Sequence, residues 1–149
     1  MVTSMKTKKE IILFVKGEQT YDGVEPEVTE LITEGTMTID DGGEIVLEYQ
    51  ESELTGMEGT NTKFIVNQNV VELTRTGMVE SRMLFERGKR NSSLYETPWG
   101  TMMVDVATTQ LAHRLGERGG VMEIGFTIAV NHQVTGENRF KIRVKEAAR

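Results

Sequence analysis

Hydrophobic residues occupy every second position along most of the chain, and this alternation limits the possible folds more than any other feature. The longest run comprises Met122, Ile124, Phe126, Ile128 and Val130. Alternation with a period of two is typical of strands that bury one face. No segment of useful length has helical periodicity, since the best candidate, residues 109–115, is short and ends at Gly116. We therefore expect an all-β protein with little helix.

Short turn-rich segments separate the alternating runs, and their number indicates about eight to ten antiparallel strands. These segments are DDGG, GMEGTNT, RGKRNSS, ERGG and VTGEN. At 149 residues the chain corresponds most simply to one domain. We predict a single antiparallel β-barrel over residues 10–146, preceded by a flexible tail over residues 1–9. A β-sandwich would leave the same alternation.

Charge and cysteine content argue against several classes of partner. The net charge of −6 opposes a general affinity for nucleic acid or anionic lipid. The chain has no cysteine, which removes disulfides and thiolate zinc sites and fits a reducing cytoplasm. The apolar run of residues 11–15 is too short for a signal peptide or a membrane span. We expect a cytoplasmic protein with neither a nucleic-acid nor a membrane partner.

The turn at residues 41–43 predicts a strand register, because the apolar residues on both sides must stay on one face. A three-residue loop with a glycine in the left-handed conformation pairs Ile39 with Ile45 and Gly35 with Tyr49. A glycine opposite Tyr49 leaves room for the ring to lie across the strand.

The last two strands are aligned by the same reasoning. A loop centred near Val134 pairs Phe126 with Ile142 and brings Glu123 close to Lys145. The outward face of the last strand then carries a row of basic residues, Arg139, Lys141, Arg143 and Lys145. Outward lysines commonly protect strands from edge pairing, so this row alone does not indicate nucleic-acid binding.

The segment YETPWG contains the single Trp of the chain and one of its two prolines. Pro98 and Gly100 fit the second and fourth positions of a type I turn. Two loop residues place Tyr95 beside Met102 on the inward face, whereas three would place Glu96 there. Because burying an unpaired carboxylate is costly, we expect Tyr95 to point inward.

Several of these segments, taken in order, resemble a small bacterial family. RTGMVESRMLFERG, YETPWG and the Val-rich strand ending in ATT are similar to the YwiB-like proteins, a domain of unknown function with a calycin-like (lipocalin-type) β-barrel. The matched positions are Gly35, Arg75, Gly77, Phe85, Tyr95, Thr97, Gly100 and Thr108. The resemblance covers nearly the whole chain and implies a single barrel in a cytoplasmic bacterial protein. It implies no established activity and transfers no catalytic residue.

Arg75 is the most informative candidate for a binding residue. It follows Val71 and Leu73 on one strand face, so its side chain should point into the barrel or its mouth. An inward arginine requires a carboxylate, backbone carbonyls or an anionic ligand. The sequence leaves open whether a glutamate near the rim or a ligand supplies that partner.

Four aromatic residues are further candidates for a ligand site: Tyr49, Phe85, Tyr95 and Trp99. Tyr and Trp suit sites that are apolar at one end and wet at the other. The alternative is that they close one end of the barrel, since a Trp in a turn often folds back over its own hairpin.

Catalytic and metal-binding patterns are absent from the sequence. His113 and His132 lie in different regions without metal-ligand spacing, and we expect both to be solvated. Glu48, Glu51 and Glu53 are expected to point outward, so no facing pair of carboxylates is predicted. We therefore expect no enzymatic activity, no cofactor and no metal.

These observations favour a non-catalytic barrel, monomeric or homodimeric, that binds a small, partly apolar ligand which can carry an anionic group. Arg75, Tyr95, Trp99, Phe85 and Tyr49 are the predicted ligand-binding residues. The alternative is a structural or protein-interaction barrel with a filled core, since more than about twenty large side chains are expected to point inward. A cavity above about 300 Å³ separates the two.

Overall fold

The computed structural model describes residues 6–20 and 25–147, which form ten strands and one short 3₁₀ helix, η1 (Glu53–Thr55). The strands are β1 (Lys6–Thr20), β2 (Glu27–Asp40), β3 (Ile45–Gln50), β4 (Thr60–Val66), β5 (Val70–Gly77), β6 (Glu80–Glu86), β7 (Arg90–Thr97), β8 (Gly100–Gly116), β9 (Gly119–Val130) and β10 (Gln133–Glu146). No α-helix occurs in these ranges. The all-β prediction is therefore confirmed.

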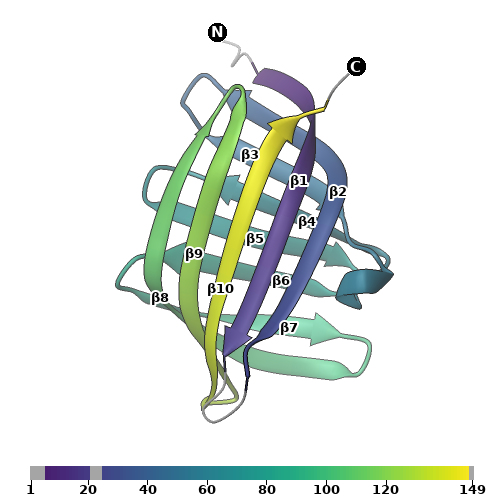
Figure 1. Ribbon diagram of the computed structural model, residues 1–149. Coiled ribbons are helices and arrows are strands. Elements are labelled where there is room, and N and C mark those ends of the chain that lie inside the picture. The colour runs from purple at the N-terminus through teal and green to yellow at the C-terminus, as the bar shows by residue number, and fades with distance from the viewer. Residues whose placement is uncertain (1–5, 21–24, 148–149) are drawn as a thin grey trace, which may run out of the picture.

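The sheet is a closed antiparallel barrel in which each strand pairs with its neighbours in the sequence (Figure 1). Pairing of β1 with β10 closes the barrel, which decides between the barrel and the sandwich. Strand β1 begins at Lys6, before the predicted domain boundary at residue 10. Residues 6–9 of the expected flexible tail pair with residues 37–40 of β2, and residues 1–5 lie outside the described residues.

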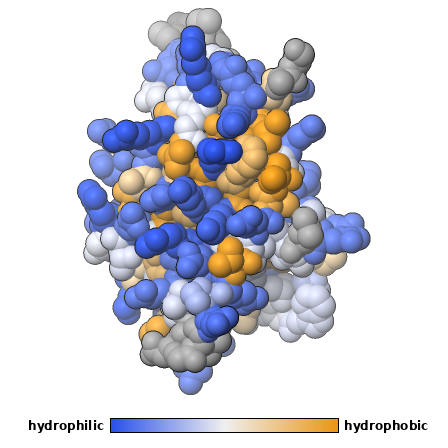
Figure 2. Space-filling view, in the orientation of Figure 1, coloured by the Kyte–Doolittle hydropathy of each residue, from blue (hydrophilic) through white to orange (hydrophobic). Residues whose placement is uncertain are grey.

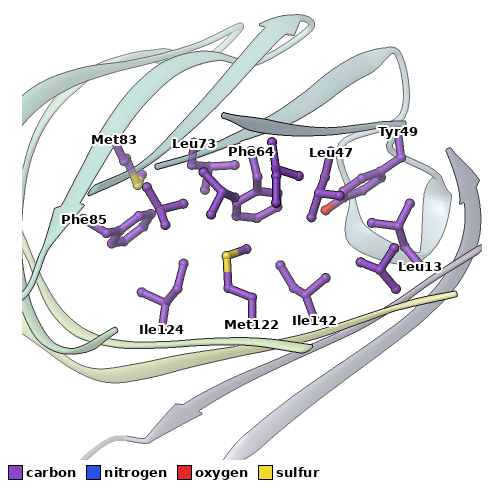
Figure 3. Close-up of a cluster of buried hydrophobic side chains, with 14 of the residues drawn as sticks. Leu13, Leu47, Tyr49, Phe64, Leu73, Met83, Phe85, Met122, Ile124 and Ile142 are labelled. Atoms are coloured by element: carbon purple, nitrogen blue, oxygen red, sulfur yellow. The ribbon is translucent and has the colours of Figure 1, made fainter. Parts of the chain in front are cut away.

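The wall of the barrel consists of two unlike parts. Strands β8, β9, β10, β1 and β2 are long, with 12 to 17 residues each, and form the front of Figure 1. Strands β3 to β7 have 6 to 8 residues and lie behind them. Side chains from the two walls meet in the core, where Leu47, Phe64 and Leu73 face Met122 and Ile142 (Figure 3).

The hairpin of β2 and β3 has the predicted register. Ile39 pairs with Ile45, Gly35 pairs with Tyr49, and Gly43 has a positive φ of 85° in the turn. A Cβ atom at Gly35 would lie 2.3 Å from the carbonyl oxygen of Glu48. Close packing therefore requires glycine here, but the nearest atoms belong to the Glu48 backbone and the Leu13 side chain, not to the Tyr49 ring for which the sequence predicted room.

The predicted register of β9 and β10 is wrong. Phe126 pairs with Asn138 rather than with Ile142, because the turn consists of Asn131 and His132, both with positive φ. Gly136, in the segment VTGEN for which a turn is predicted, lies instead at an irregularity within β10. The inward face of β10 is unchanged, because the error shifts the pairing by an even number of residues.

This shift also changes the partner of Glu123. The carboxylate of Glu123 lies 3.8 Å from the Nζ of Lys141, not beside Lys145 as expected. The basic row of β10 is exposed, as predicted.

The hairpin of β7 and β8 confirms the inward position of Tyr95. Thr97 pairs with Gly100 across a two-residue turn, so Tyr95 lies opposite Met102. Further along β8 the register shifts between Thr108 and Gln110, and the strand continues through residues 109–115, the segment with the best helical pattern.

Candidate functional site

A row of inward residues crosses strands β3 to β7 at one end of the barrel. The strand registers pair Tyr49 with Thr62, Thr62 with Arg75, Arg75 with Ser81, and Ser81 with Tyr95. We call these five residues the polar layer. The neighbouring row contains only apolar side chains, Leu47, Phe64, Leu73 and Met83. The interior therefore changes from apolar to polar within one step along each strand.

Arg75 is the charged residue of this layer, and its side chain is enclosed. It is only 9% exposed, and its Nε is buried without a hydrogen-bond partner. The part of the chain that the structure describes contains no carboxylate in an ion pair with Arg75. The inward position predicted for Arg75 is confirmed. An internal salt-bridge partner, one of the two readings left open by the sequence, is not found in the described ranges.

Glu51 lies close to the polar layer, and hydroxyl groups surround its carboxylate. Its Oε1 accepts a hydrogen bond from Thr62 Oγ1 at 3.1 Å, and its Oε2 accepts one from Thr55 Oγ1 at 3.0 Å. The Tyr49 phenol is near enough for the negative charge of Glu51 to raise its pKa. With these donors Glu51 is stabilised without a direct contact to Arg75.

The ionisation of Tyr49 reflects the same surroundings. Burial, and then the negative charge of Glu51, hold the pKa of the Tyr49 phenol well above its usual range, while the charge of Arg75 opposes this shift. Tyr49 therefore stays protonated at neutral pH and remains a hydrogen-bond donor. Figure 3 shows Tyr49 at one end of the apolar cluster, beyond Leu47.

A cavity of about 570 Å³ opens at this end of the barrel, between the end of β1, the beginning of β2, η1 and the middle of β10. Its polar lining includes Tyr49, Glu51, Arg75 and Asn138. Its apolar lining includes Val15, Leu31, Met57 and Phe140. This volume lies within the range of about 300 to 1,000 Å³ that is usual for small-molecule pockets.

The rim of this cavity carries more acidic than basic residues. Glu18, Glu27 and Glu53 contribute to it, together with Arg139, which pairs with Glu18 across β1 and β10. This charge distribution disfavours a ligand with several negative charges and leaves Arg75 as the enclosed cation.

The structure brings together only some of the predicted site residues. Arg75 and Tyr49 line the cavity. Tyr95 is half-buried in the same layer, and its hydroxyl contacts the Sδ of Met57 at 3.9 Å. Phe85 is fully buried in the apolar core, with its ring centroid 4.8 Å from that of Phe126.

Trp99 lies away from this cavity. Its side chain is 91% exposed at the turn between β7 and β8, where it covers neither the hairpin nor the mouth of the barrel. The turn is held by Thr97, whose Oγ1 accepts a hydrogen bond from the Trp99 backbone NH at 3.2 Å. The Trp side chain is therefore the largest hydrophobic group left in solvent among the described residues.

Two lining residues, Glu51 and Asn138, were missed by the sequence analysis. Glu51 is only 6% exposed, so the expectation that it points outward is wrong. It follows Tyr49 by two residues, and this same-face spacing was the signal available in the sequence. Asn138 carries a buried Nδ2 without a hydrogen-bond partner, but its place opposite Phe126 depends on the irregular β9–β10 hairpin.

The two histidines lie outside the cavity. His113 contacts the backbone oxygen of Asn67 at 3.1 Å, and His132 lies 3.7 Å from Asp105 at an exposed turn. Within residues 6–20 and 25–147 no cluster of three or more His, Cys, Asp or Glu residues could hold a metal ion. The same ranges contain no helix with the length and hydrophobicity needed to cross a membrane.

Comparison with known proteins places this barrel in a family. The model of a domain of unknown function, DUF1934, matches residues 13–142. The chain belongs to this family. No curated protein matches the chain.

One solved structure shares the fold of this DUF1934 protein. The crystal structure of the ywiB protein from Bacillus subtilis is similar with a TM-score of 0.84 and 22% sequence identity. The match covers 95% of this chain and 94% of that chain. The family resemblance noted in the sequence is therefore confirmed, and at this identity the structural likeness shows the fold alone.

Proposed function

We propose that this DUF1934 protein is a non-catalytic binding protein for a small, partly apolar molecule with one anionic group. The observation that carries the proposal is the Arg75 side chain, enclosed and without an ion pair among the described residues, at the wall of a cavity of about 570 Å³. Burying a cation without a partner is unfavourable, and an anionic group of a ligand would offset that cost.

The other lining residues define the rest of the ligand. Glu51 accepts hydrogen bonds from two threonine hydroxyls and forms no ion pair with Arg75. Val15, Leu31 and Phe140 supply apolar contacts. The acidic rim disfavours a polyanion. We therefore expect a monovalent anion, such as a carboxylate, joined to an apolar group.

The number of strands supports the proposal that one end of the barrel has space for a ligand. An eight-stranded barrel is just wide enough for side chains to fill its interior, and diameter grows with strand number. With ten strands, and threonine or serine at several inward positions of the polar layer, space remains at this end. A binding site at the mouth is also what the calycin-like resemblance leads us to expect.

Mass spectrometry on protein purified gently from the cells that produce it tests the proposal. Native and denaturing spectra are compared, and we expect an additional mass that disappears on denaturation. The Arg75→Gln variant should lose that mass, while Arg114→Gln, the same change at an exposed position of β8, should retain it.

A second measurement uses a defined probe. Hexanoate should raise the Tm of the parent protein, and hexylamine, with the same apolar chain and the opposite charge, should not. Equal shifts with both compounds, or an equal hexanoate shift in Arg75→Gln, would exclude Arg75 as the anion-binding group.

A structural or interaction role is the second candidate, and the exposed Trp99 favours it. Twenty buried hydrophobic residues fill most of the barrel, and a Trp that is 91% exposed at a turn can contact a protein partner. A clean apo mass with no hexanoate shift, together with a protein partner lost in Trp99→Ala, would support this candidate. In either case we propose a cytoplasmic location, because the chain contains no cysteine.

A further inference from the structure

The outer surface of β10, β1 and β2 combines apolar side chains with two stripes of opposite charge. On β10 the basic row Arg139, Lys141, Arg143 and Lys145 is exposed, and on β2 Glu30 and Glu34 are exposed. Between these strands, β1 carries the half-buried side chains of Ile12 and Phe14. Figure 2 views this side of the barrel and shows hydrophobic residues grouped among hydrophilic ones.

The strand registers place these side chains in defined rows. The central row is Ile32, Phe14 and Arg143, and Ile32 is 69% exposed. The guanidinium carbon of Arg143 lies 4.5 Å from the centre of the Phe14 ring. The row on one side is Glu34, Ile12 and Lys145, and the row on the other side is Glu30, Lys16 and Lys141. Each row thus has a glutamate or Ile32 on β2 and a basic residue on β10.

The carboxylates on β2 have one basic residue opposite them on β1, Lys16, which lies beside Glu30 in the strand register. Neither Glu30 nor Glu34 forms an ion pair in the part of the chain that the structure describes. Strand β1 separates them from the basic row, and two strand spacings amount to about 9.6 Å. The surface is therefore dipolar, with a negative side on β2 and a positive side on β10 flanking Ile12, Phe14 and Lys16 of β1.

We propose that this surface is a homodimer interface in which a second copy packs against it about a two-fold axis parallel to β1. Such an axis places β10 of one copy over β2 of the other and keeps each row in register. Lys145 of the second copy then faces Glu34, and Lys141 of the second copy faces Glu30. Ile12 and Phe14 meet their own counterparts, and Ile32 lies beneath the second copy's Arg143.

This symmetry is selected by the charges. A two-fold axis perpendicular to the strands would place the basic stripe on β10 of one copy against the same basic stripe of the other copy, which is unfavourable. Lys16, close to the proposed axis, would meet its own counterpart, and Glu30 of each copy lies beside this pair. A partner of uniform charge would satisfy only one of the two stripes, so a second copy fits this surface better.

Light scattering on the purified full chain tests the proposal directly. At about 100 µM, where a dimer with a micromolar dissociation constant is nearly saturated, we expect twice the 16.7 kDa mass of one chain. A monomer at this concentration would overturn the proposal.

Two charge-reversed variants make the test specific. We expect two double variants to be monomeric, Lys141→Glu with Lys145→Glu and Glu30→Lys with Glu34→Lys. In each variant, residues 141 and 145 of one copy would face residues of the same charge at 30 and 34 of the other copy. Their equimolar mixture should form mixed dimers. In a mixed dimer the reversed, acidic β10 of one variant faces the reversed, basic β2 of the other, and the unchanged β2 and β10 also face each other with opposite charges. With one variant uniformly labelled with ¹⁵N, native mass spectrometry separates mixed dimers from dimers of either variant, and failure to form mixed dimers would overturn the proposal.

Two controls complete the design. Lys63→Glu with Lys89→Glu makes the same charge change on β4 and at the turn after β6, and should leave the dimer intact. If a charge-reversed variant fails to fold, Ile32→Ser tests the apolar centre instead, and a dimer as stable as that of the parent would count against the interface. Ligand binding by the cavity is a separate measurement, so either proposal can fail without the other.

Discussion

The two ends of the barrel interior follow the same alternation but have different chemistry. At one end, rows such as Leu47, Phe64 and Leu73 are fully buried and in contact with the facing wall. One step further along the same strands, Tyr49, Thr62 and Arg75 form the polar layer. The apolar end stabilises the fold by burial and packing. The polar end has fewer apolar side chains and leaves a cavity, so the apolar core and the candidate binding site lie at different positions along the same strands.

The largest expected effect is at the apolar end. Leu73→Ala should lower the free energy of unfolding by about 2 to 5 kcal/mol, because Leu73 is fully buried and its truncation leaves a cavity. Leu94→Ala, the same change at a side chain that is 55% exposed on β7, should change it by less than about 0.5 kcal/mol. Denaturant unfolding measures both. A similar loss of unfolding free energy in both variants would show that burial of Leu73 at the apolar end does not stabilise the fold as described.

Replacing Arg75, two residues after Leu73 on β5, should affect ligand binding and not lower the stability of the fold. Arg75→Met removes an enclosed charge that has no ion pair among the described residues, and it keeps a side chain of similar length. We expect the ligand-free protein to be as stable as the parent or more stable by about 1 kcal/mol, and hexanoate binding to be lost. A loss of about 2 kcal/mol or more in denaturant unfolding would indicate an internal partner for Arg75.

The last expected effect concerns Tyr49 at the boundary between the two ends, and it depends on pH. Because the pKa of Tyr49 is raised in the folded state, its contribution to stability is complete below 10.0, the ordinary pKa, and is lost as pH rises above it. Replacing Tyr49 with Phe should cost about 0.5 to 1.5 kcal/mol at neutral pH, because the interaction of the buried phenol with its polar neighbours is lost.

The control is to compare the unfolding free energies of the parent and of Tyr49→Phe at several pH values. Above pH 10 the unfolded parent releases the phenolic proton while the folded parent retains it, so the advantage of the parent over Tyr49→Phe should shrink. Urea unfolding at several pH values measures this difference. An advantage that stays constant or grows through the alkaline range would contradict the burial of a protonated Tyr49.

Most of the fold could be predicted because side-chain direction in a strand is a local property. The inward positions of Arg75, Tyr95 and Tyr49 required only the period of two and, for Tyr95, the length of one turn. The β2–β3 register was predictable for the same reason, since its loop had to keep the apolar residues on one face. These predictions did not depend on distant parts of the chain.

The composition of the site was less predictable, because it depends on which strands lie side by side and where each strand ends. Trp99 follows Tyr95 closely in the sequence, yet it lies at an exposed turn while Tyr95 stays in the polar layer. Glu51 lies beyond the end of β3, where alternation no longer predicts direction reliably, and hydroxyls from η1 and β4 make its burial possible.

The sequence by itself determined the class of fold, its antiparallel strands and the residues that point inward, because alternation and turn chemistry act over a few residues. The tertiary structure alone decided the closure of the barrel, the register of β9 and β10 and the cavity beside Arg75. A turn with two positive φ values and an irregularity in β10 shifted that register without changing which face is buried. Alternation leaves such shifts unresolved, since every even shift buries the same face but brings different residues together.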